Sequence, residues 1–163
     1  DLEEVRRESF RRILEDAGRP DEALAARLAE VYFRSRYAAS GLYDDVLPTL
    51  EALSPLHSLG IVSNGNRYPA HLGLENLMTF HVYAQDHGGI EKPDHRIFQI
   101  AAQRAGCAPH ELAHVGDSLE NDVAGAVNAG IRSVWLNRNG GQARSTRPDF
   151  EITSLRELMG ILY

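Results

Sequence analysis

The sequence predicts an α/β fold in which parallel strands alternate with helices, preceded by a pair of helices. From residue 42 onward, short apolar runs alternate with stretches of helical periodicity, and this alternation is typical of a parallel sheet with right-handed crossovers. Before residue 42, apolar side chains recur at helical spacing, with an interruption at Gly18. We therefore expect a helical unit over residues 1–43 and an α/β unit over residues 44–163.

The region before residue 42 is expected to form a helical hairpin. Apolar residues from Leu2 to Ala17 fall on one face of a first helix, which Gly18 ends. Pro20 and Asp21 begin a second helix that ends near Gly41. Arginines and glutamates interleave along the first helix, which is typical of a solvated face with i,i+4 ion pairs rather than of a phosphate-binding patch.

Within the α/β unit, each element is predicted by its periodicity and by the residues at its ends. Pro93 lies at a first helical position and Gly106 ends that helix. Gly116 closes an apolar run, and Gly130 ends the helix that follows it. The expected strands cover residues 61–64, 81–83, 112–115 and 133–136, and the expected helices 48–53, 93–105, 117–129 and from 154 onward, with a polar loop over 137–147.

The composition is that of an ordinary globular protein and argues against several classes of partner. The chain has 163 residues, of which 43% are hydrophobic and 25% are charged, and its formal net charge is −6. This charge argues against nucleic acid or an anionic membrane as a partner, and no apolar run is long enough to span a bilayer. Because Cys107 is the sole cysteine, an intrachain disulfide is impossible and a reducing, cytoplasmic setting is expected.

The stretch from His114 to Val123 joins the end of a predicted strand to the start of a helix. Asp117 lies at the carboxyl end of this strand, and Asp122 lies in the first turn of the helix. Ligands bind at this edge of open α/β sheets, and two carboxylates that converge there commonly hold a hard cation such as Mg²⁺. The alternative is that both carboxylates only cap the helix, where negative charge is favourable.

Lys92 is the only lysine among 17 lysine and arginine residues. A surface charge tolerates either residue type, whereas a site that needs a compact, pivoting ammonium does not tolerate arginine. Lys92 is therefore a candidate functional residue, and the alternative is that one lysine has survived a bias toward arginine by chance.

Residues 110–114 read His-Glu-Leu-Ala-His, which matches the H-E-x-x-H pattern of zinc metalloproteases. That chemistry needs both histidines on one face of an uninterrupted helix, with the glutamate as general base. Pro109 precedes this segment and Gly116 follows it almost at once, so barely one helical turn remains. His114 also belongs to the predicted strand. We therefore do not expect a zinc site here.

Three stretches lie in order at or near the carboxyl ends of predicted strands: Ile61 to Gly65, Glu91 to Asp94, and Gly116 to Asp122. In combination they resemble the haloacid dehalogenase superfamily, specifically its phosphatase-like members with a helical cap, over nearly the whole chain. The resemblance implies a Rossmann-like three-layer sandwich with a parallel sheet. It also implies that residues 1–43 are part of a cap that closes over the substrate and excludes water.

The resemblance further implies a role for the first two stretches. Ser63 would hold a transferring phosphoryl oxygen through its hydroxyl and nearby backbone N–H groups, including that of Gly65. Asn64 would orient the substrate. Lys92 would neutralise charge on the nucleophile and on the phosphoryl group, and would thereby contribute to phosphate binding.

In the third stretch, Asp117 would ligate Mg²⁺, and Asp122 would ligate it or steady its water shell. The chemistry asks for these residue types independently of the family, because phosphoryl transfer spreads negative charge over three oxygens and depends on electrostatic stabilisation. The resemblance therefore implies a Mg²⁺-dependent phosphatase that acts on a small phosphorylated metabolite.

The nucleophile of this family has no counterpart in the chain. In the family an aspartate behind an N-terminal apolar strand attacks phosphorus to form an aspartyl-phosphate, and an acid/base aspartate follows two residues later. Asp44 and Asp45 follow no buried strand, and the family's absent strand would lie between those ending at Ser63 and Asp117. Residue 1 is Asp rather than Met, and we expect an upstream segment to supply this strand and both aspartates.

Two alternative functions stay open. A haloacid dehalogenase proper shares the fold and the Ser-Asn element, but it needs no metal and usually carries a stretch rich in Ser and Asn where this chain has Gly116-Asp117-Ser118, so Asp117 favours the phosphatase. The other alternative is a catalytically silent fragment or binding module that keeps a phosphate and metal pocket.

Overall fold

The computed structural model describes residues 2–38, 41–65, 68–143 and 146–162. The chain divides into two compact units, residues 1–42 and residues 43–163. Within the described ranges, no helix combines the length and the apolar character that crossing a bilayer requires.

The first unit is the expected pair of helices, α1 (Leu2–Asp16) and α2 (Glu22–Ala38). Gly18 adopts a left-handed φ of 68°, which glycine tolerates without steric cost, and the chain turns there. The carboxylate of Asp21 accepts a hydrogen bond from the backbone N–H of Leu24 and so caps α2. Phe10 and Tyr32 pack edge to face across the hairpin, with ring centroids 6.0 Å apart.

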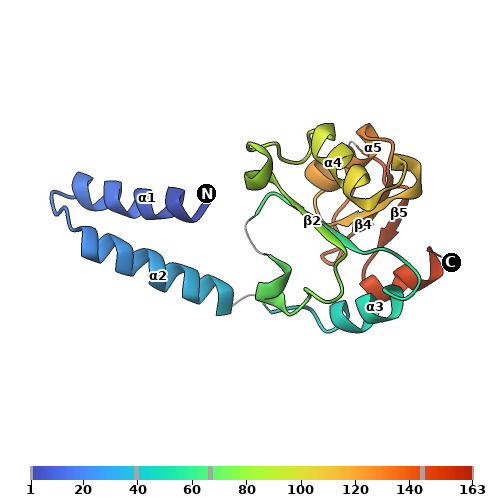
Figure 1. Ribbon diagram of the computed structural model, residues 1–163, viewed down its shortest axis with the longest axis horizontal. Coiled ribbons are helices and arrows are strands. Elements are labelled where there is room, and N and C mark those ends of the chain that lie inside the picture. Colours follow the sequence, from blue (N-terminus) through green and yellow to red (C-terminus); the bar gives the residue numbers. More distant parts are fainter. Residues whose placement is uncertain (1, 39–40, 66–67, 144–145, 163) are drawn as a thin grey trace. The chain divides into compact units, whose positions relative to one another are not determined.

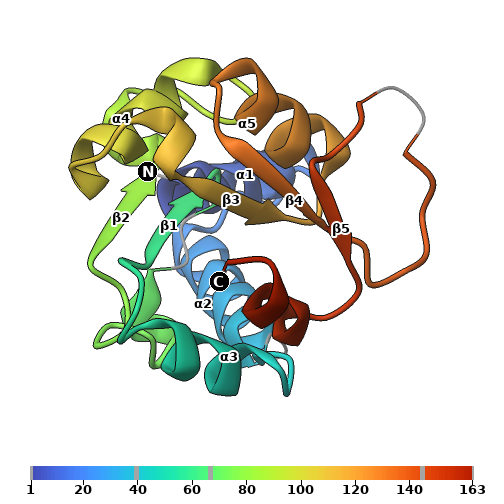
Figure 2. The same ribbon diagram turned by 90° about the vertical axis from the view of Figure 1, so that its right-hand side faces the viewer.

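The second unit is an α/β domain whose strands are all parallel, as the sequence predicts. Its strands and α-helices (Figures 1 and 2) are α3 (Val46–Leu53), β1 (Gly60–Ser63), β2 (Phe80–Tyr83), α4 (His95–Ala105), β3 (Ala113–Gly116), α5 (Ala124–Asn128), β4 (Arg132–Leu136) and β5 (Phe150–Ile152).

The strands form two separate sheets, β1–β2 and β3–β4–β5. In register, Val62 lies beside Val82 in the first sheet, and Val115 lies beside Val134 in the second. Figure 2 shows the strands in the order β2, β1, β3, β4, β5. No ladder of hydrogen bonds joins β1 to β3 in the described part of the chain, so each of these two strands has one edge without a partner strand.

Helices cover both faces of the strands (Figure 2). On one face α4 and α5 bury an apolar cluster centred on Val82, Phe98 and Ala126. On the other face α3 and the 3-10 turn η5 (Leu155–Gly160) bury a second cluster. Burial of this apolar surface is the main favourable contribution to folding, and it fixes the strand ends that carry the polar residues. The buried members of the second cluster are Leu53, Val134, Ile152 and Leu158.

Several elements differ from the sequence-based expectation; α3, for example, begins at Val46 rather than at Pro48. Helix α4 begins at His95 rather than at Pro93, because the Asp94 carboxylate accepts from the N–H of Arg96 and caps the helix one residue after the proline. The helix after Asp117 opens with a π-helical turn, Leu119–Val123, before α5. Strand β5 was not predicted, because two of its three residues are exposed and so short a segment carries no readable alternation.

A buried carboxylate, Asp45, ties α3 to the other end of the unit. It accepts hydrogen bonds from the Arg138 guanidinium at 2.8 Å, the Ser154 hydroxyl at 2.7 Å and the Leu155 N–H at 2.9 Å. The hydrogen bond from Arg138 holds the pKa of Asp45 well below its usual range, although burial alone would raise it. Asp45 is therefore charged in the folded protein and unites three segments that are distant in sequence.

Replacing Asp45 by Asn is expected to lower the free energy of unfolding by about 2–4 kcal/mol, because the largely buried guanidinium of Arg138 then lacks a carboxylate. Urea denaturation at neutral pH measures this loss. Asp44 is exposed and immediately precedes Asp45, so Asp44→Asn is the matched control, with an expected change below about 0.5 kcal/mol.

The same carboxyl group should make stability depend on pH. Because the pKa of Asp45 is lower in the folded than in the unfolded chain, its contribution is fully present above about pH 4 and is lost as the pH falls toward the folded pKa. The unfolding free energy of the native chain should therefore fall more steeply below about pH 4 than that of Asp45→Asn. Parallel curves for the two proteins would contradict this assignment.

Candidate active site

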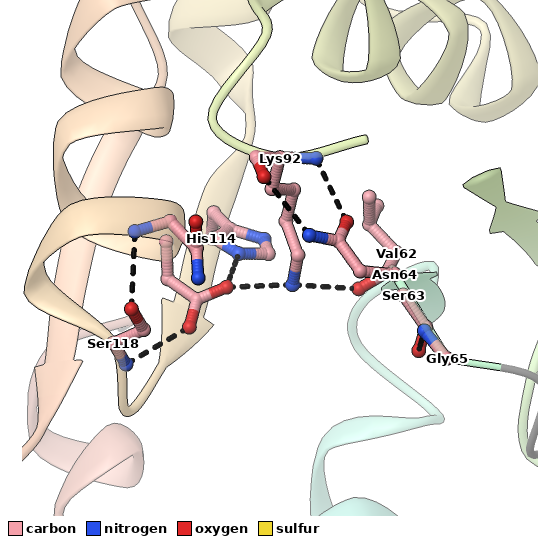
Figure 3. A network of polar contacts seen from close by, with 9 residues as sticks. Val62, Ser63, Asn64, Gly65, Lys92, His114 and Ser118 are labelled. Carbon is pink, nitrogen blue, oxygen red and sulfur yellow. Dashed lines mark hydrogen bonds and ion pairs between the residues drawn. The ribbon is translucent and has the colours of Figure 1, made fainter. Parts of the chain in front are cut away.

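The ammonium group of Lys92 lies between the two sheets. Its Nζ donates to the carbonyl oxygen of Val62 in β1 at 3.0 Å and to Oδ1 of Asp122, which follows β3, at 2.6 Å. Figure 3 shows the Lys92 side chain between the Val62–Gly65 segment and His114. The side chains of Lys92 and Asp122 are only 13% and 7% exposed, so this ion pair is shielded from water and from salt.

Asp122 is held by three donors from three segments. Its Oδ1 accepts hydrogen bonds from Nζ of Lys92 and from Nε2 of His114, the latter at 3.0 Å. Its Oδ2 accepts a hydrogen bond from the backbone N–H of Ser118 at 3.0 Å. Burial alone would raise the pKa of Asp122, but these hydrogen bonds and the charge of Lys92 keep the pKa well below its usual range. Asp122 is therefore an ionised carboxylate that anchors Lys92.

Gly116 leaves the space that Asp122 occupies. A Cβ atom at position 116 would lie 2.2 Å from Cγ of Asp122, so any side chain there would displace the carboxylate. The strand end must therefore be glycine for the following π-helical turn to bring Asp122 back over it.

The side-chain amide of Asn64 forms two hydrogen bonds with the main chain of Lys92. Its Nδ2 donates to the Lys92 carbonyl at 2.9 Å, and its Oδ1 accepts from the Lys92 N–H at 2.7 Å. The sequence-based expectation was that Asn64 orients the substrate. In the structure its amide is engaged by the backbone of Lys92, so Asn64 fixes the position from which the ammonium extends.

Ser63 and Gly65 form a tight turn at the end of β1. The N–H of Gly65 donates to the Ser63 hydroxyl oxygen at 3.0 Å. An oxygen that accepts in this way keeps its own hydrogen for another acceptor. Ser63 directly follows Val62, whose carbonyl binds Lys92, so the hydroxyl and the ammonium belong to one neighbourhood (Figure 3).

Asp117 presents an exposed carboxylate beside this cluster. Its backbone carbonyl accepts from the indole N–H of Trp135, a buried residue of β4, at 3.0 Å. The next residue, Ser118, donates its N–H to Asp122. Asp117 is thus held through its main chain, and its side chain is exposed.

The residues present fit a magnesium ion in part. Mg²⁺ is commonly bound by one or two carboxylates together with phosphate oxygens and water. Asp117 offers one such carboxylate, whereas Asp122, the second predicted ligand, is engaged by Lys92 and His114. The described residues contain no group of three or more His, Cys, Asp or Glu side chains suited to a metal. A second carboxylate would have to come from elsewhere.

The H-E-x-x-H segment does not form a zinc-binding helix. His110 lies in a 3-10 turn, Pro109–Glu111, and His114 lies in β3, so the two histidines do not share a helix face. The carboxylate of Glu111 accepts from the backbone N–H of Ala108.

Sequence reasoning missed three contacts of the site: His114 with Asp122, Asn64 with Lys92, and Trp135 with Asp117. The signal for His114 was a polar residue inside an apolar strand. No local sequence pattern predicts the other two contacts, because the residues in them are 28 and 18 positions apart in the sequence.

Comparison with known proteins places the chain in a family. The profile of the haloacid dehalogenase-like hydrolases matches residues 2–130. Over 153 residues the chain is 35% identical to a glyceraldehyde 3-phosphate phosphatase of Methanopyrus kandleri, a match that covers 88% of this chain and 66% of the relative. Over 156 residues it is 36% identical to a phosphoserine phosphatase of Thermus thermophilus, covering 91% and 61%. The chain thus spans about two thirds of the length of these relatives.

Solved structures agree with this placement. A 2-haloacid dehalogenase from Pseudomonas syringae superposes with a TM-score of 0.85 at 36% identity, covering 99% of this chain and 71% of that one. A HAD-like hydrolase from Bacillus subtilis bound to magnesium superposes with a TM-score of 0.76 at 26% identity, covering 99% and 73%. With its profile match, its curated relatives and its parallel α/β architecture, the chain belongs to the haloacid dehalogenase-like hydrolases.

Proposed function

We propose that this chain carries the larger part of a Mg²⁺-dependent phosphatase of small phosphorylated metabolites. The observation that carries the proposal is the Lys92 ammonium, which lies mostly shielded between two sheets, with the Ser63 turn on one side and the Asp117 segment on the other. Two relatives that are 35% and 36% identical to the chain over the aligned residues are phosphatases of small phosphate esters.

The nucleophile would enter between β1 and β3. Both strands have an edge without a partner strand, and Lys92 reaches across from one to the other. A further parallel strand in this slot would satisfy both edges, and a carboxylate at its carboxyl end would lie near the ammonium. We propose that this strand brings the aspartate that attacks phosphorus and, two residues on, the aspartate that transfers protons.

In the proposed reaction the nucleophilic carboxylate attacks phosphorus, the bond from phosphorus to the substrate oxygen breaks, and the acid/base aspartate protonates the leaving alcohol. Water then hydrolyses the aspartyl-phosphate. Ser63 donates its hydroxyl to one phosphoryl oxygen, and Lys92 offsets the negative charge shared by nucleophile and phosphoryl group. Asn64 acts indirectly, because it holds the backbone of Lys92.

Asp117 and the nucleophilic aspartate are the residues that would hold Mg²⁺. When bound, the ion neutralises charge on the phosphoryl oxygens and helps to orient them. Trp135 keeps the main chain of Asp117 in place for this task. The hairpin of α1 and α2 would belong to a cap that closes over the substrate and excludes water.

A haloacid dehalogenase is the second candidate, because the chain is 36% identical to such an enzyme from Pseudomonas syringae. Asp117 favours the phosphatase, since a carboxylate at this point serves a cation. The two functions separate cleanly in an assay of the chain extended upstream by the family's first strand, its two aspartates and the connecting cap helices. Phosphate release from an aryl phosphate supports the phosphatase, and halide release from a 2-haloacid supports the dehalogenase. The absence of both activities supports a silent module.

In this extended protein, Asp117→Asn is expected to reduce phosphate release on the order of 100-fold or more, because the amide no longer binds a divalent cation well. Removal of Mg²⁺ by EDTA should reduce the native rate similarly and should have little further effect on the variant. Glu120 is exposed and lies in the same loop-to-helix segment, so Glu120→Gln is the matched control and should keep its rate. Equal loss in both variants would contradict the role of Asp117.

Lys92→Ala should lower kcat on the order of 100- to 1000-fold, since it removes the charge that faces the transition state. Lys92→Arg should not restore the rate, because a planar guanidinium cannot place one compact charge between the Val62 carbonyl and the Asp122 carboxylate. Steady-state kinetics of both variants, with exposed Arg104→Ala as control, make the comparison. Full activity in Lys92→Arg would show that charge alone suffices and would contradict the proposed geometry.

A further inference from the structure

His114 is a polar residue in an otherwise apolar strand, and none of the roles proposed above uses it. Its side chain is only 13% exposed. The ring packs edge to face against Phe98 of α4, with ring centroids 5.0 Å apart and planes at 88°. This contact restricts the orientation of the mostly buried imidazole.

That orientation directs Nε2 at the carboxylate of Asp122. The distance to Oδ1 is 3.0 Å, and the same oxygen receives Lys92 Nζ at 2.6 Å. An ionised carboxylate only accepts hydrogen bonds, so Nε2 carries the hydrogen in this contact. His114 and Lys92 therefore share one acceptor atom, and the place of that atom decides where the ammonium lies.

We propose that His114 is a positioning residue for Lys92, which it controls through Asp122. Ser118 donates to Oδ2, and His114 donates to Oδ1 beside Lys92, so hydrogen bonds at both oxygens restrict rotation of the carboxylate. The ammonium of Lys92 then has one anchoring point beside β3 and a second at the Val62 carbonyl of β1. Without the His114 donor the carboxylate turns more freely, and Lys92 loses its fixed place between the strands.

What the ammonium then does rests on the proposed function, but its placement is measured without turnover. Lys92 is the only lysine in the sequence, so labelling the 163-residue chain with ¹⁵N,¹³C-lysine yields a single lysine side-chain signal in NMR spectra. An ammonium held in two hydrogen bonds and shielded from water exchanges its protons slowly, and a mobile one exchanges them quickly. The exchange rate at Nζ is thus a direct reading of its anchoring.

The test compares two amides at position 114. In His114→Gln, the terminal N–H₂ group can reach Asp122 as Nε2 does. In His114→Asn the side chain is shorter by one methylene, so its N–H₂ group does not reach Asp122. We expect the Gln variant to keep the native Nζ exchange rate within about twofold and the Asn variant to raise it on the order of tenfold. His110→Phe, which changes the exposed histidine four residues earlier, is the control and should leave the signal unchanged.

His114→Phe separates hydrogen bonding from packing, because it keeps a ring against Phe98 and removes the donor. We expect its Nζ exchange to rise as in the Asn variant. An unchanged rate in both the Phe and the Asn variants would overturn the proposal. A raised rate in Gln together with an unchanged one in Phe would also overturn it, since ring packing alone would then hold the site.

A kinetic arm distinguishes this inference from the proposed function. In the extended protein, His114→Asn should lower kcat on the order of tenfold with KM within about twofold, and His114→Gln should restore it. If the extended protein releases no phosphate while the Nζ exchange follows the expected order, the proposed function fails and the positioning role stands. If phosphate is released but substitutions at position 114 leave the Nζ exchange rate unchanged, the positioning role fails and the proposed function stands.

Discussion

The mostly buried side chain of Lys92 and the buried carboxylate of Asp122 meet where the two sheets of the α/β unit do not pair with each other. Removing either charge from water is costly, and the pair is tolerable because each partner has further hydrogen bonds. The Val62 carbonyl accepts a second hydrogen bond from Lys92, and His114 and Ser118 donate further hydrogen bonds to Asp122. The pair therefore depends on three strand or helix ends at once, and each of them is fixed by the pair in return.

This dependence explains why the surrounding residues are what they are. Position 116 is glycine because the Asp122 side chain occupies the space that a Cβ atom would need. The Asn64 amide forms hydrogen bonds with the backbone of Lys92 rather than with a ligand. Among their neighbours, Ser63 keeps a hydroxyl hydrogen for another acceptor, and Asp117 has an exposed carboxylate. Under the proposed function, donors and acceptors around this charged centre would stabilise charge that develops on a phosphoryl group.

Much of the fold was readable from the sequence, because parallel strands buried on both faces appear as short apolar runs and glycine marks the ends of the helices. The sequence also predicted Ser63 and Asp117 at strand ends, where α/β proteins bind ligands, and singled out Lys92 because it is the only lysine. It could not assign the partners of these residues. Asn64 and Lys92 meet across 28 positions, and Lys92 and Asp122 across 30, so their contacts arise from tertiary packing rather than from local pattern. The H-E-x-x-H segment also shows that a local motif does not determine tertiary contacts. Its residues are divided between a 3-10 turn and a strand, and its second histidine, His114, contacts Asp122.

The coupling energy between Lys92 and Asp122 is the most direct test of this account. A double-mutant cycle of Lys92→Met, Asp122→Asn and the combined variant, followed by urea denaturation, isolates this energy from the packing of either side chain. We expect a favourable coupling of at least about 1.5 kcal/mol for a close, desolvated charge pair. A coupling within about 0.5 kcal/mol of zero would mean that the two groups are independent, and the ion pair would not be the interaction that joins the two sheets.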